Sequence, residues 1–265
     1  MKLYYSPGAC SLSPHIALRE AGLAFTPVLA STKSHKLQDG TDYYGINPLG
    51  YVPLLELDDG TRLREGPAIV QFIADQAPTK NLAPANGTMG RYRLQEWLTF
   101  IGTEIHKGFS PLFNPATPDE YKTIAKDKLL SRLAWVNTQL EGRDYLLGDH
   151  FSVADGYLFT VLNWAKPMAV DLSGFPALTA FHARVGARPA HQYLGPDDET
   201  ITLNGLLLPE FAGTRLSLDL LHALADTGKA WPLIQGDGTY YGAYLIERIT
   251  TTGTLNFQDA APRRT

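Results

Sequence analysis

The stretch MKLYYSPGACSLSPH, residues 1–15, determines how this chain begins to fold. Leu3 to Tyr5 is typical of a short strand, and Ser6 to Gly8 is a turn sequence. The signals of a helix follow, namely two candidate caps, a proline in the first turn and a glycine at the end: Ser11, Ser13, Pro14 and Gly22. The stretch therefore predicts a strand that leads through a turn into a helix, with Cys10 at the junction.

The same alternation of strand and helix continues to about residue 80. Strands are predicted at residues 25–29, 52–57 and 62–64, and Asp59-Gly60 marks a hairpin between the last two. Pro67 then begins a helix that runs to Gln76. The order βαβ, loop, ββα is the thioredoxin-like pattern, so we expect an α/β domain over residues 1–80.

After a short linker the pattern becomes helical. Apolar residues recur at helical spacing over residues 91–113. Thr117 to Glu120 and Ser152 to Asp155 both have the composition of a capping box, and Phe175-Pro176 begins one more helix. We therefore expect an all-α domain over residues 88–190.

Residues 191–265 have a third pattern, which predicts an appended α+β module. Asn204-Gly205 marks a hairpin within an alternating stretch, and an amphipathic helix follows at residues 216–227. Further strands are predicted at residues 231–235, 240–249 and 254–257.

Composition excludes several function classes. A net charge of -4 over 265 residues provides no basic field for nucleic acid. No run of eighteen apolar residues predicts a membrane span, and the first residues resemble a strand rather than a signal peptide, so we expect a cytoplasmic protein. The single cysteine excludes an internal disulfide and a multi-cysteine metal site, and we expect no metal.

Cys10 is the residue with the clearest chemical potential. A thiol at the start of a helix meets free backbone N–H groups and the positive end of the helix dipole, which favour the thiolate. The alternative is a buried structural cysteine, which is the commoner fate of a lone cysteine. Position alone leaves the two interpretations equally weighted.

A set of motifs at matching positions resembles the beta class of bacterial glutathione transferases over about 190 residues. Besides residues 1–15, the matching segments are Asn47-Pro48, Gly50, Val52-Pro53, Glu65-Gly66, Ile105 to Gly108, Asp149 to Asp155 and Ala187 to Ala190. The resemblance implies a thioredoxin-like domain, an all-α domain and glutathione as co-substrate. It also implies that Cys10 contacts the glutathione sulfur and can form a mixed disulfide with it.

The resemblance also implies how the tripeptide is held. Val52 would pair its backbone with the cysteinyl residue through a cis bond to Pro53, and Tyr5 belongs to the same group of binding residues. Glu65 would hold the ammonium group and the N–H groups at Gly66 the γ-glutamyl carboxylate. For Glu65, a charge that favours a helix start is an equally good interpretation.

Further site residues are implied on the long helix predicted at residues 91–113. His106 matches a histidine that steadies the glutathione thiolate, although a lone helical histidine is more often structural. The weaker candidates on this helix are Thr103, Glu104 and Lys107. Thr99 replaces an asparagine that is common in the family.

The carboxylate anchor also departs from the family pattern. A lysine usual in the family is replaced by His35, so the cation for the glycyl carboxylate is either His35 or Lys36. Both this change and Thr99 could weaken affinity for glutathione without removing the thiol chemistry.

The end of the chain resembles a different family, the U tail protein of contractile-tail phages. The matching segments are Arg184 to Ala190, Ile201 to Gly205, Ala225 to Lys229, Tyr241-Gly242 and Ala260 to Arg264. Arg184 to Ala190 fits both families and is a plausible join. That family continues into another strand where this sequence stops at Thr265, so the resemblance predicts a module with an exposed edge and no tail-assembly activity. A C-terminal extension specific to one lineage is the other interpretation.

Taken together, these observations predict a glutathione transferase that acts on an apolar electrophile or a disulfide. Phe109, Phe113 and Trp164 are candidates for the apolar acceptor pocket. The resemblance implies a homodimer. The competing interpretation is a non-catalytic interaction protein or a phage-tail-derived fusion product.

Overall fold

Strand β1 (Lys2–Tyr5) lies in the middle of a four-stranded sheet with the order β2-β1-β3-β4. It pairs in parallel with β2 (Thr26–Leu29) and antiparallel with β3 (Leu54–Glu56). Strand β4 (Arg62–Arg64) forms a hairpin with β3 across the predicted Asp59-Gly60 turn. The parallel β1–β2 pair requires a crossover, and the helix between these strands provides it.

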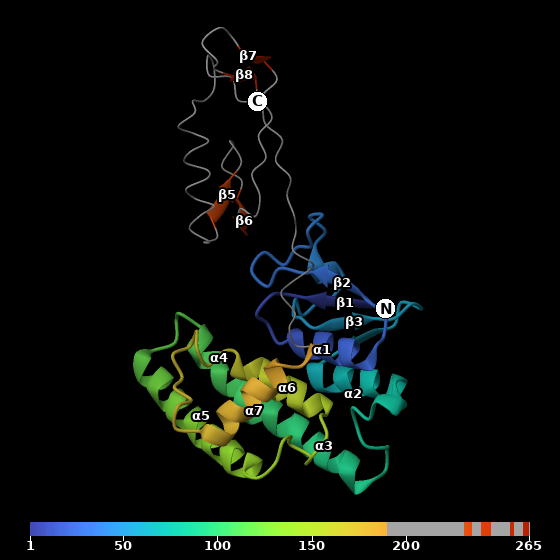
Figure 1. Ribbon diagram of the computed structural model, residues 1–265, viewed down its shortest axis with the longest axis vertical. Helices are drawn as coiled ribbons and strands as arrows, with labels where there is room; N and C mark the ends of the chain where they lie inside the picture. Colours follow the sequence, from blue (N-terminus) through green and yellow to red (C-terminus); the bar gives the residue numbers. More distant parts are fainter. Residues whose placement is uncertain (190–230, 235–239, 245–254, 257–261, 265) are drawn as a thin grey trace. The chain divides into compact units, whose positions relative to one another are not determined.

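The computed structural model describes residues 1–189, 231–234, 240–244, 255–256 and 262–264. The chain divides into two units, Met1–Asp198 and Glu199–Thr265. The first unit holds the sheet and the helices that can be followed from blue to yellow in Figure 1.

Helices α1 (Leu12–Ala21) and α2 (Gly66–Gln76) pack against each other on one face of the sheet (Figure 1). Leu3 points to that face and is fully buried in the main core. The predicted thioredoxin-like order of strands and helices is thereby confirmed.

The ends of α1 were predicted in part. Gly22 adopts the left-handed conformation and ends the helix, as expected. Ser11 occupies the N-cap position, but its hydroxyl exchanges hydrogen bonds with the backbone of Ser6 instead of capping the helix. The serine therefore stabilises the turn that carries Cys10.

The other face of the sheet is covered near its centre by a loop. Tyr43, in the 3-10 turn η1 (Tyr43–Gly45), is buried against Tyr4, with ring centroids 5.6 Å apart. Its hydroxyl donates to the carbonyl of Tyr51 at 2.9 Å, and Asn47 Nδ2 donates to the same oxygen at 2.7 Å. These bonds fix the segment that leads into Val52 and Pro53.

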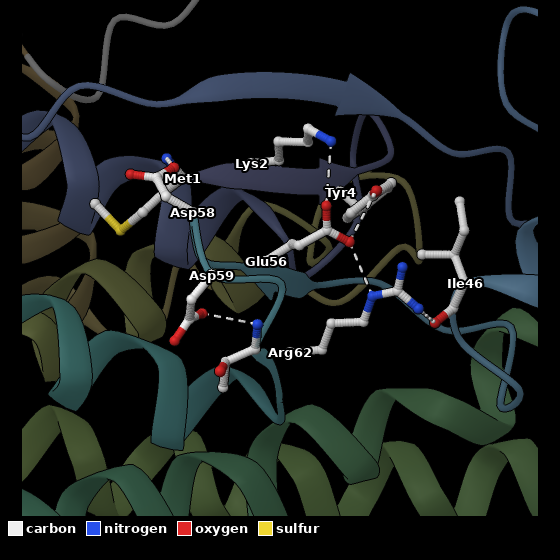
Figure 2. Close-up of polar contacts among 9 residues, drawn as sticks. Met1, Lys2, Tyr4, Ile46, Glu56, Asp58, Asp59 and Arg62 are labelled. Carbon is white, nitrogen blue, oxygen red and sulfur yellow. Dashed lines mark hydrogen bonds and ion pairs between the residues drawn. The ribbon is translucent and has the colours of Figure 1, made fainter.

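Beyond Tyr4, the same face carries a charge network centred on Glu56 (Figure 2). Its carboxylate accepts from Lys2 Nζ at 3.1 Å and from Arg62 Nε at 2.8 Å. Burial alone would raise the pKa of Glu56, but the hydrogen bonds from Arg62 and Lys2 bring it below its ordinary value. Lys2 and Arg62 lie directly opposite Glu56 on the neighbouring strands, so one carboxylate links β1, β3 and β4.

From α2 onward, the described residues of the first unit, up to residue 189, are mainly helical, as predicted. A short 3-10 turn, η2 (Pro78–Lys80), follows α2 and precedes the other helices. The helices are α3 (Met89–Phe100), the π-helix η3 (Ile101–His106), α4 (Lys107–Phe113), α5 (Asp119–Leu140), α6 (Val153–Leu162) and α7 (Pro176–Gly186). The single helix predicted at residues 91–113 therefore contains a π-turn, in which Lys107 N–H bonds to the carbonyl of Gly102.

Of the two predicted capping boxes, one forms. Ser152 and Asp155 make the reciprocal bonds at the start of α6, and the fully buried Asp155 also accepts from the N–H of Leu146 at 2.8 Å. The prediction of a box at Thr117 is wrong. Pro118 is the residue that precedes α5, and no side chain caps this helix.

The sheet and the helices share one continuous core because α6 packs directly on α1. Gly156 makes this close approach possible, since a Cβ atom there would lie 3.3 Å from Ile16 Cγ2. Trp164, shortly after α6, donates from Nε1 to the carbonyl of Gly8 at 2.7 Å. The loop that carries Cys10 is therefore held by the helical part of the chain.

In the second unit the structure describes two antiparallel pairs. Strand β5 (Trp231–Ile234) pairs with β6 (Tyr240–Tyr244), and β7 (Leu255–Asn256) pairs with β8 (Pro262–Arg264). The predicted hairpin at Asn204-Gly205 and the helix predicted at residues 216–227 lie outside the described residues. No helix within the described part of the chain has the length and apolar character that a membrane crossing needs.

Candidate active site

Cys10 lies at the end of the turn between β1 and α1, as predicted, and its side chain is half-buried. Its Sγ donates to the carbonyl oxygen of Val52 at 3.3 Å. Val52 is buried and precedes Pro53 through a cis peptide bond. The structure therefore brings together Cys10 and the Val52-Pro53 segment, which are 42 positions apart.

The surroundings of Cys10 favour the thiol, although the start of the helix by itself favours the thiolate. Burial raises the pKa of Cys10 to about 11, and the carboxylate of Glu65 acts in the same direction. The backbone N–H groups at the helix start and the charge of Lys107 lower it by less. At neutral pH the side chain is therefore a protonated hydrogen-bond donor, consistent with its bond to Val52.

Glu65 and Gly66 form the start of α2, and Glu65 is close enough to act electrostatically on Cys10. Glu65 is exposed and adopts a left-handed backbone conformation with φ 67°. A non-glycine residue in this region costs on the order of 1 kcal/mol, and such residues concentrate at ligand sites. Its side chain makes no capping hydrogen bond, while its negative charge at the start of α2 still interacts favourably with the helix dipole.

His106 is the last residue of the π-helix. Its Nδ1 lies 2.7 Å from the hydroxyl of Tyr157, and the Trp164 ring lies edge-on to it at a centroid distance of 4.9 Å. Burial, and then the charge of Lys107, lowers the pKa of His106 to about 4. The imidazole is therefore neutral at physiological pH.

Trp164 connects His106 to an aromatic wall. Its ring lies 5.7 Å from that of Phe109 and 5.3 Å from that of Phe113, measured between centroids. Phe109 is buried and Phe113 is exposed. The wall thus presents an apolar surface beside the turn that Trp164 fixes at Gly8.

His35, one of the two predicted carboxylate anchors, already makes contacts with its own loop. His35 has a left-handed backbone conformation, and its Nδ1 lies 3.3 Å from the carbonyl of Gly50 while its ring packs on Tyr44. A Cβ atom at Gly50 would lie 2.8 Å from His35 Nδ1, so this contact requires glycine. Lys36 is exposed on the same loop.

The weaker candidates for site residues on the long helical segment differ in where their side chains lie. Glu104 is turned toward α5, where Arg132 Nε contacts it at 2.8 Å, and we therefore no longer place it at the thiol site. Thr103 donates to the carbonyl of Thr99, and both side chains are exposed. Lys107 is exposed and close enough to act electrostatically on Cys10.

Two residues behave in ways that the sequence did not suggest. Tyr5 is buried beside His15, with ring centroids 6.4 Å apart, so it belongs to the support of the Cys10 turn. Tyr157, which contacts His106, was not predicted as a site residue. The signal that could have found it is a tyrosine hydroxyl within the otherwise apolar stretch that follows the Ser152 capping box.

Comparison with known proteins matches both parts of the first unit. Residues 8–76 match the glutathione S-transferase N-terminal domain, and residues 100–189 match the glutathione S-transferase C-terminal domain. Glutathione S-transferase GstA of Escherichia coli O157:H7 is 47% identical over 72% of this chain and 96% of that protein. The chain belongs to the glutathione S-transferase family.

Solved structures of glutathione S-transferases match the same part of the chain. The bacterial glutathione S-transferase BphK, solved as a ternary complex, is 61% identical with a TM-score of 0.72, covering 72% of this chain and 96% of that one. A sphingomonad glutathione S-transferase solved with glutathione is 48% identical with a TM-score of 0.70, covering 72% and 95%. This chain is therefore a glutathione transferase, and glutathione is its co-substrate.

The transferase match ends where a second one begins. Residues 179–265 match the family Phage P2 GpU, which overlaps the transferase C-terminal domain at residues 179–189. Most of the stretch Arg184 to Ala190, identified as a join from its sequence, falls within this overlap.

The residues present fit a bound tripeptide thiol. The Val52 carbonyl and the Cys10 thiol offer polar atoms for the cysteinyl part, and Glu65 offers a carboxylate for an ammonium group. Within the described residues, no cluster of histidine, cysteine and acidic side chains could hold a metal ion.

Proposed function

We propose that Cys10 and His106 form the thiol site of this transferase. The observation that carries this proposal is the hydrogen bond from Cys10 Sγ to the carbonyl of Val52, because that backbone is where the cysteinyl part of glutathione would pair. The glutathione sulfur would then lie beside Cys10. When glutathione binds, the S–H group that Cys10 donates to the Val52 carbonyl in the free enzyme can turn and donate to the glutathione thiolate.

Cys10 also gives the enzyme a mixed-disulfide route. The Cys10 thiolate attacks the glutathione sulfur of a disulfide between glutathione and an acceptor thiol, a Cys10–glutathione disulfide forms, and the acceptor leaves as a thiolate. A free glutathione thiolate then attacks the Cys10–glutathione disulfide, which regenerates the Cys10 thiolate and releases glutathione disulfide. Because the pKa of Cys10 is about 11, little thiolate is present at neutral pH and this route is slow in the free enzyme.

His106 would hold the glutathione thiolate by a hydrogen bond from its neutral ring. A hydrogen bond to the charged form favours that form and lowers the pKa of the bound thiol. Lys107 would add a positive field at the same place, as it already does at Cys10.

The remaining binding roles follow the resemblance. Glu65 would hold the ammonium group, and the N–H groups at Gly66 would hold the γ-glutamyl carboxylate. His35 or Lys36 would meet the glycyl carboxylate. Thr99 and Thr103, exposed on the same long helical segment as His106, remain candidates for contacts of the bound molecules.

The acceptor would be an apolar electrophile or a disulfide held against the aromatic wall. Phe113 supports this because it is a large apolar side chain left exposed beside Trp164. Aromatic rings stack on such a surface with favourable offset or edge-on geometry.

A homodimer is supported by exposed apolar side chains on α3 and α5. They are Met89, Tyr92, Tyr121, Ile124 and Trp135. Trp135 also lines a shallow, open depression of the surface together with Phe100 and Arg132. Light scattering should give twice the chain mass, and a monomer at micromolar concentration would contradict the proposal.

For the rest of the chain, we propose domain limits of 1–80 and 88–190, followed by a module of phage-tail origin over residues 191–265. The family match at residues 179–265 supports this origin. We propose a cytoplasmic location, where reduced glutathione is abundant.

The test of the proposed site is binding combined with covalent trapping. The wild-type chain should be retained on immobilised glutathione and should gain one glutathione-sized mass after treatment with glutathione disulfide. Cys10→Ala should lose the adduct while it keeps its fold. A chain that is not retained, or an adduct that persists in Cys10→Ala, would refute the proposal.

A further inference from the structure

Tyr157 is a buried residue of α6 whose hydroxyl reaches the neighbouring π-helix. The oxygen lies 2.7 Å from His106 Nδ1, and the two rings are edge-on with centroids 5.9 Å apart. The side chain is 3% exposed. The hydrogen bond therefore forms away from solvent, where its direction matters.

The direction of this hydrogen bond follows from the hydrogen-bonding capacity of each partner. A tyrosine hydroxyl has one hydrogen to donate, whereas a neutral imidazole has one donor nitrogen and one acceptor nitrogen. Among the described residues, His106 is the only hydrogen-bond partner of the Tyr157 hydroxyl. If Tyr157 accepted from His106, its own buried hydrogen would have no acceptor, which is the costly arrangement.

We propose that Tyr157 is a positioning residue that donates to His106 Nδ1 and thereby holds the ring in the Nε2–H tautomer. The Nε2–H group is then the donor available to the sulfur of bound glutathione. The proposal rests on the proposed role of His106 and specifies which atom performs it. It makes Tyr157 necessary for the correct tautomer but not for contact with the substrate.

The charged groups around the pair preserve this arrangement. Burial above all, with the negative charge of Glu65 acting in the same direction, raises the pKa of Tyr157 well above its ordinary value, so the hydroxyl keeps its proton. Burial and the charge of Lys107 keep His106 neutral. Donor and acceptor states therefore stay fixed across the physiological pH range.

Packing also restricts rotation of the imidazole. The Trp164 ring lies edge-on to it at 4.9 Å and is itself held by the bond to Gly8. The π-turn places His106 at its end, and such turns often occur at functional sites. Tyr157 from α6 and Trp164 thus orient one ring that the π-helix presents.

The first measurement is the tautomer itself, read by NMR of the full-length protein with isotope-labelled histidine. The His106 signals are assigned by their loss in His106→Ala. The wild type should show the Nε2–H form, and Tyr157→Phe should show a mixture of both tautomers. An Nδ1–H form in the wild type would overturn the proposal.

The second measurement is the titration of bound glutathione, followed by thiolate absorbance. Tyr157→Phe should raise the pKa of the bound thiol by up to about one unit, with a fall of up to about tenfold in kcat/KM toward a chlorodinitrobenzene acceptor at neutral pH. Tyr145→Phe is the matched control, because it removes a hydroxyl that bonds Arg188 instead. It should leave both quantities unchanged.

The double variant separates this inference from the proposed function. If His106→Ala leaves the thiol titration unchanged, the proposed role of His106 fails and this inference fails with it. If His106→Ala raises the pKa of the bound thiol but Tyr157→Phe does not, only the inference fails. Support requires that Tyr157→Phe has no further effect in the His106→Ala background.

Discussion

At the residue scale, protonation is set by burial more than by position in the helix. The start of α1 favours a thiolate at Cys10, yet the raised pKa of about 11 shows that desolvation outweighs the helix terminus. His106 follows the same rule, since burial leaves its ring neutral. The free enzyme thus presents two neutral donors, a thiol and an imidazole N–H, to a charged sulfur.

The protonation of Cys10 predicts a steep pH dependence of its alkylation. Only the thiolate reacts, and below the pKa its fraction rises about tenfold for each pH unit. Reaction with iodoacetamide, followed by intact mass, should therefore accelerate continuously from pH 7 to about 10, since the pKa of Cys10 is about 11. Every adduct that forms on a cysteine reports Cys10, because it is the chain's single cysteine. A rate that levels off near pH 7 would show a thiolate after all.

Trp164 is predicted to act through its indole N–H as well as through its ring. Trp164→Phe keeps most of the aromatic wall but leaves the Gly8 carbonyl without this donor, at a cost of about 1 kcal/mol. We expect a lower unfolding free energy in urea and a severalfold weaker affinity for glutathione by calorimetry, because the Cys10 turn loosens. Tyr145→Phe is the control, because it removes a hydroxyl that bonds Arg188 and not the Cys10 turn. Equal effects of the two changes would contradict the role of the Gly8 bond.

At the element scale, local signals were predictable when all their partners lie within a few residues. The Asp59-Gly60 hairpin, the Gly22 helix end and the Ser152 capping box are of this kind. The π-turn before Lys107 was not predictable, since it depends on how the long helical segment packs against α5 and α6. The apparent box at Thr117 fails because Pro118 takes the capping position with an extended backbone.

The two predicted boxes provide a matched test of capping. Asp155→Ala removes acceptors for the N–H groups of Leu146 and Ser152, so we expect a loss of about 2–4 kcal/mol in the unfolding free energy. Glu120→Ala, at the corresponding place of the predicted Thr117 box, removes an exposed carboxylate that makes no cap and should cost under about 0.5 kcal/mol. The unfolding free energy of both variants is measured by urea denaturation. Similar losses would mean that the buried bonds of Asp155 contribute little.

At the scale of the whole molecule, some residues of the candidate site could be predicted from the sequence, whereas their contacts across the helical bundle could not. Cys10, Val52 and His106 were found because their motifs resemble a known family. The position of Glu104 against Arg132, and that of Tyr157 against His106, depends on which helix faces meet across the bundle. Helical periodicity assigns a residue to a face but does not identify the partner of that face.

The last prediction concerns the division of the chain at Asp198. Cys10, Glu65, His106, Tyr157 and Trp164 all lie in the unit Met1–Asp198, whose core is continuous from sheet to helices. A chain ended after Asp198 should therefore keep its glutathione affinity and its kcat/KM to within about twofold, since a domain with its own core can fold alone. Activity toward a chlorodinitrobenzene acceptor and light scattering should be measured on both lengths, with Cys10→Ala in each as the control for the thiol site. A loss of activity greater than about tenfold in a folded short chain would contradict this prediction, because it would show that residues 199–265 contribute to the site.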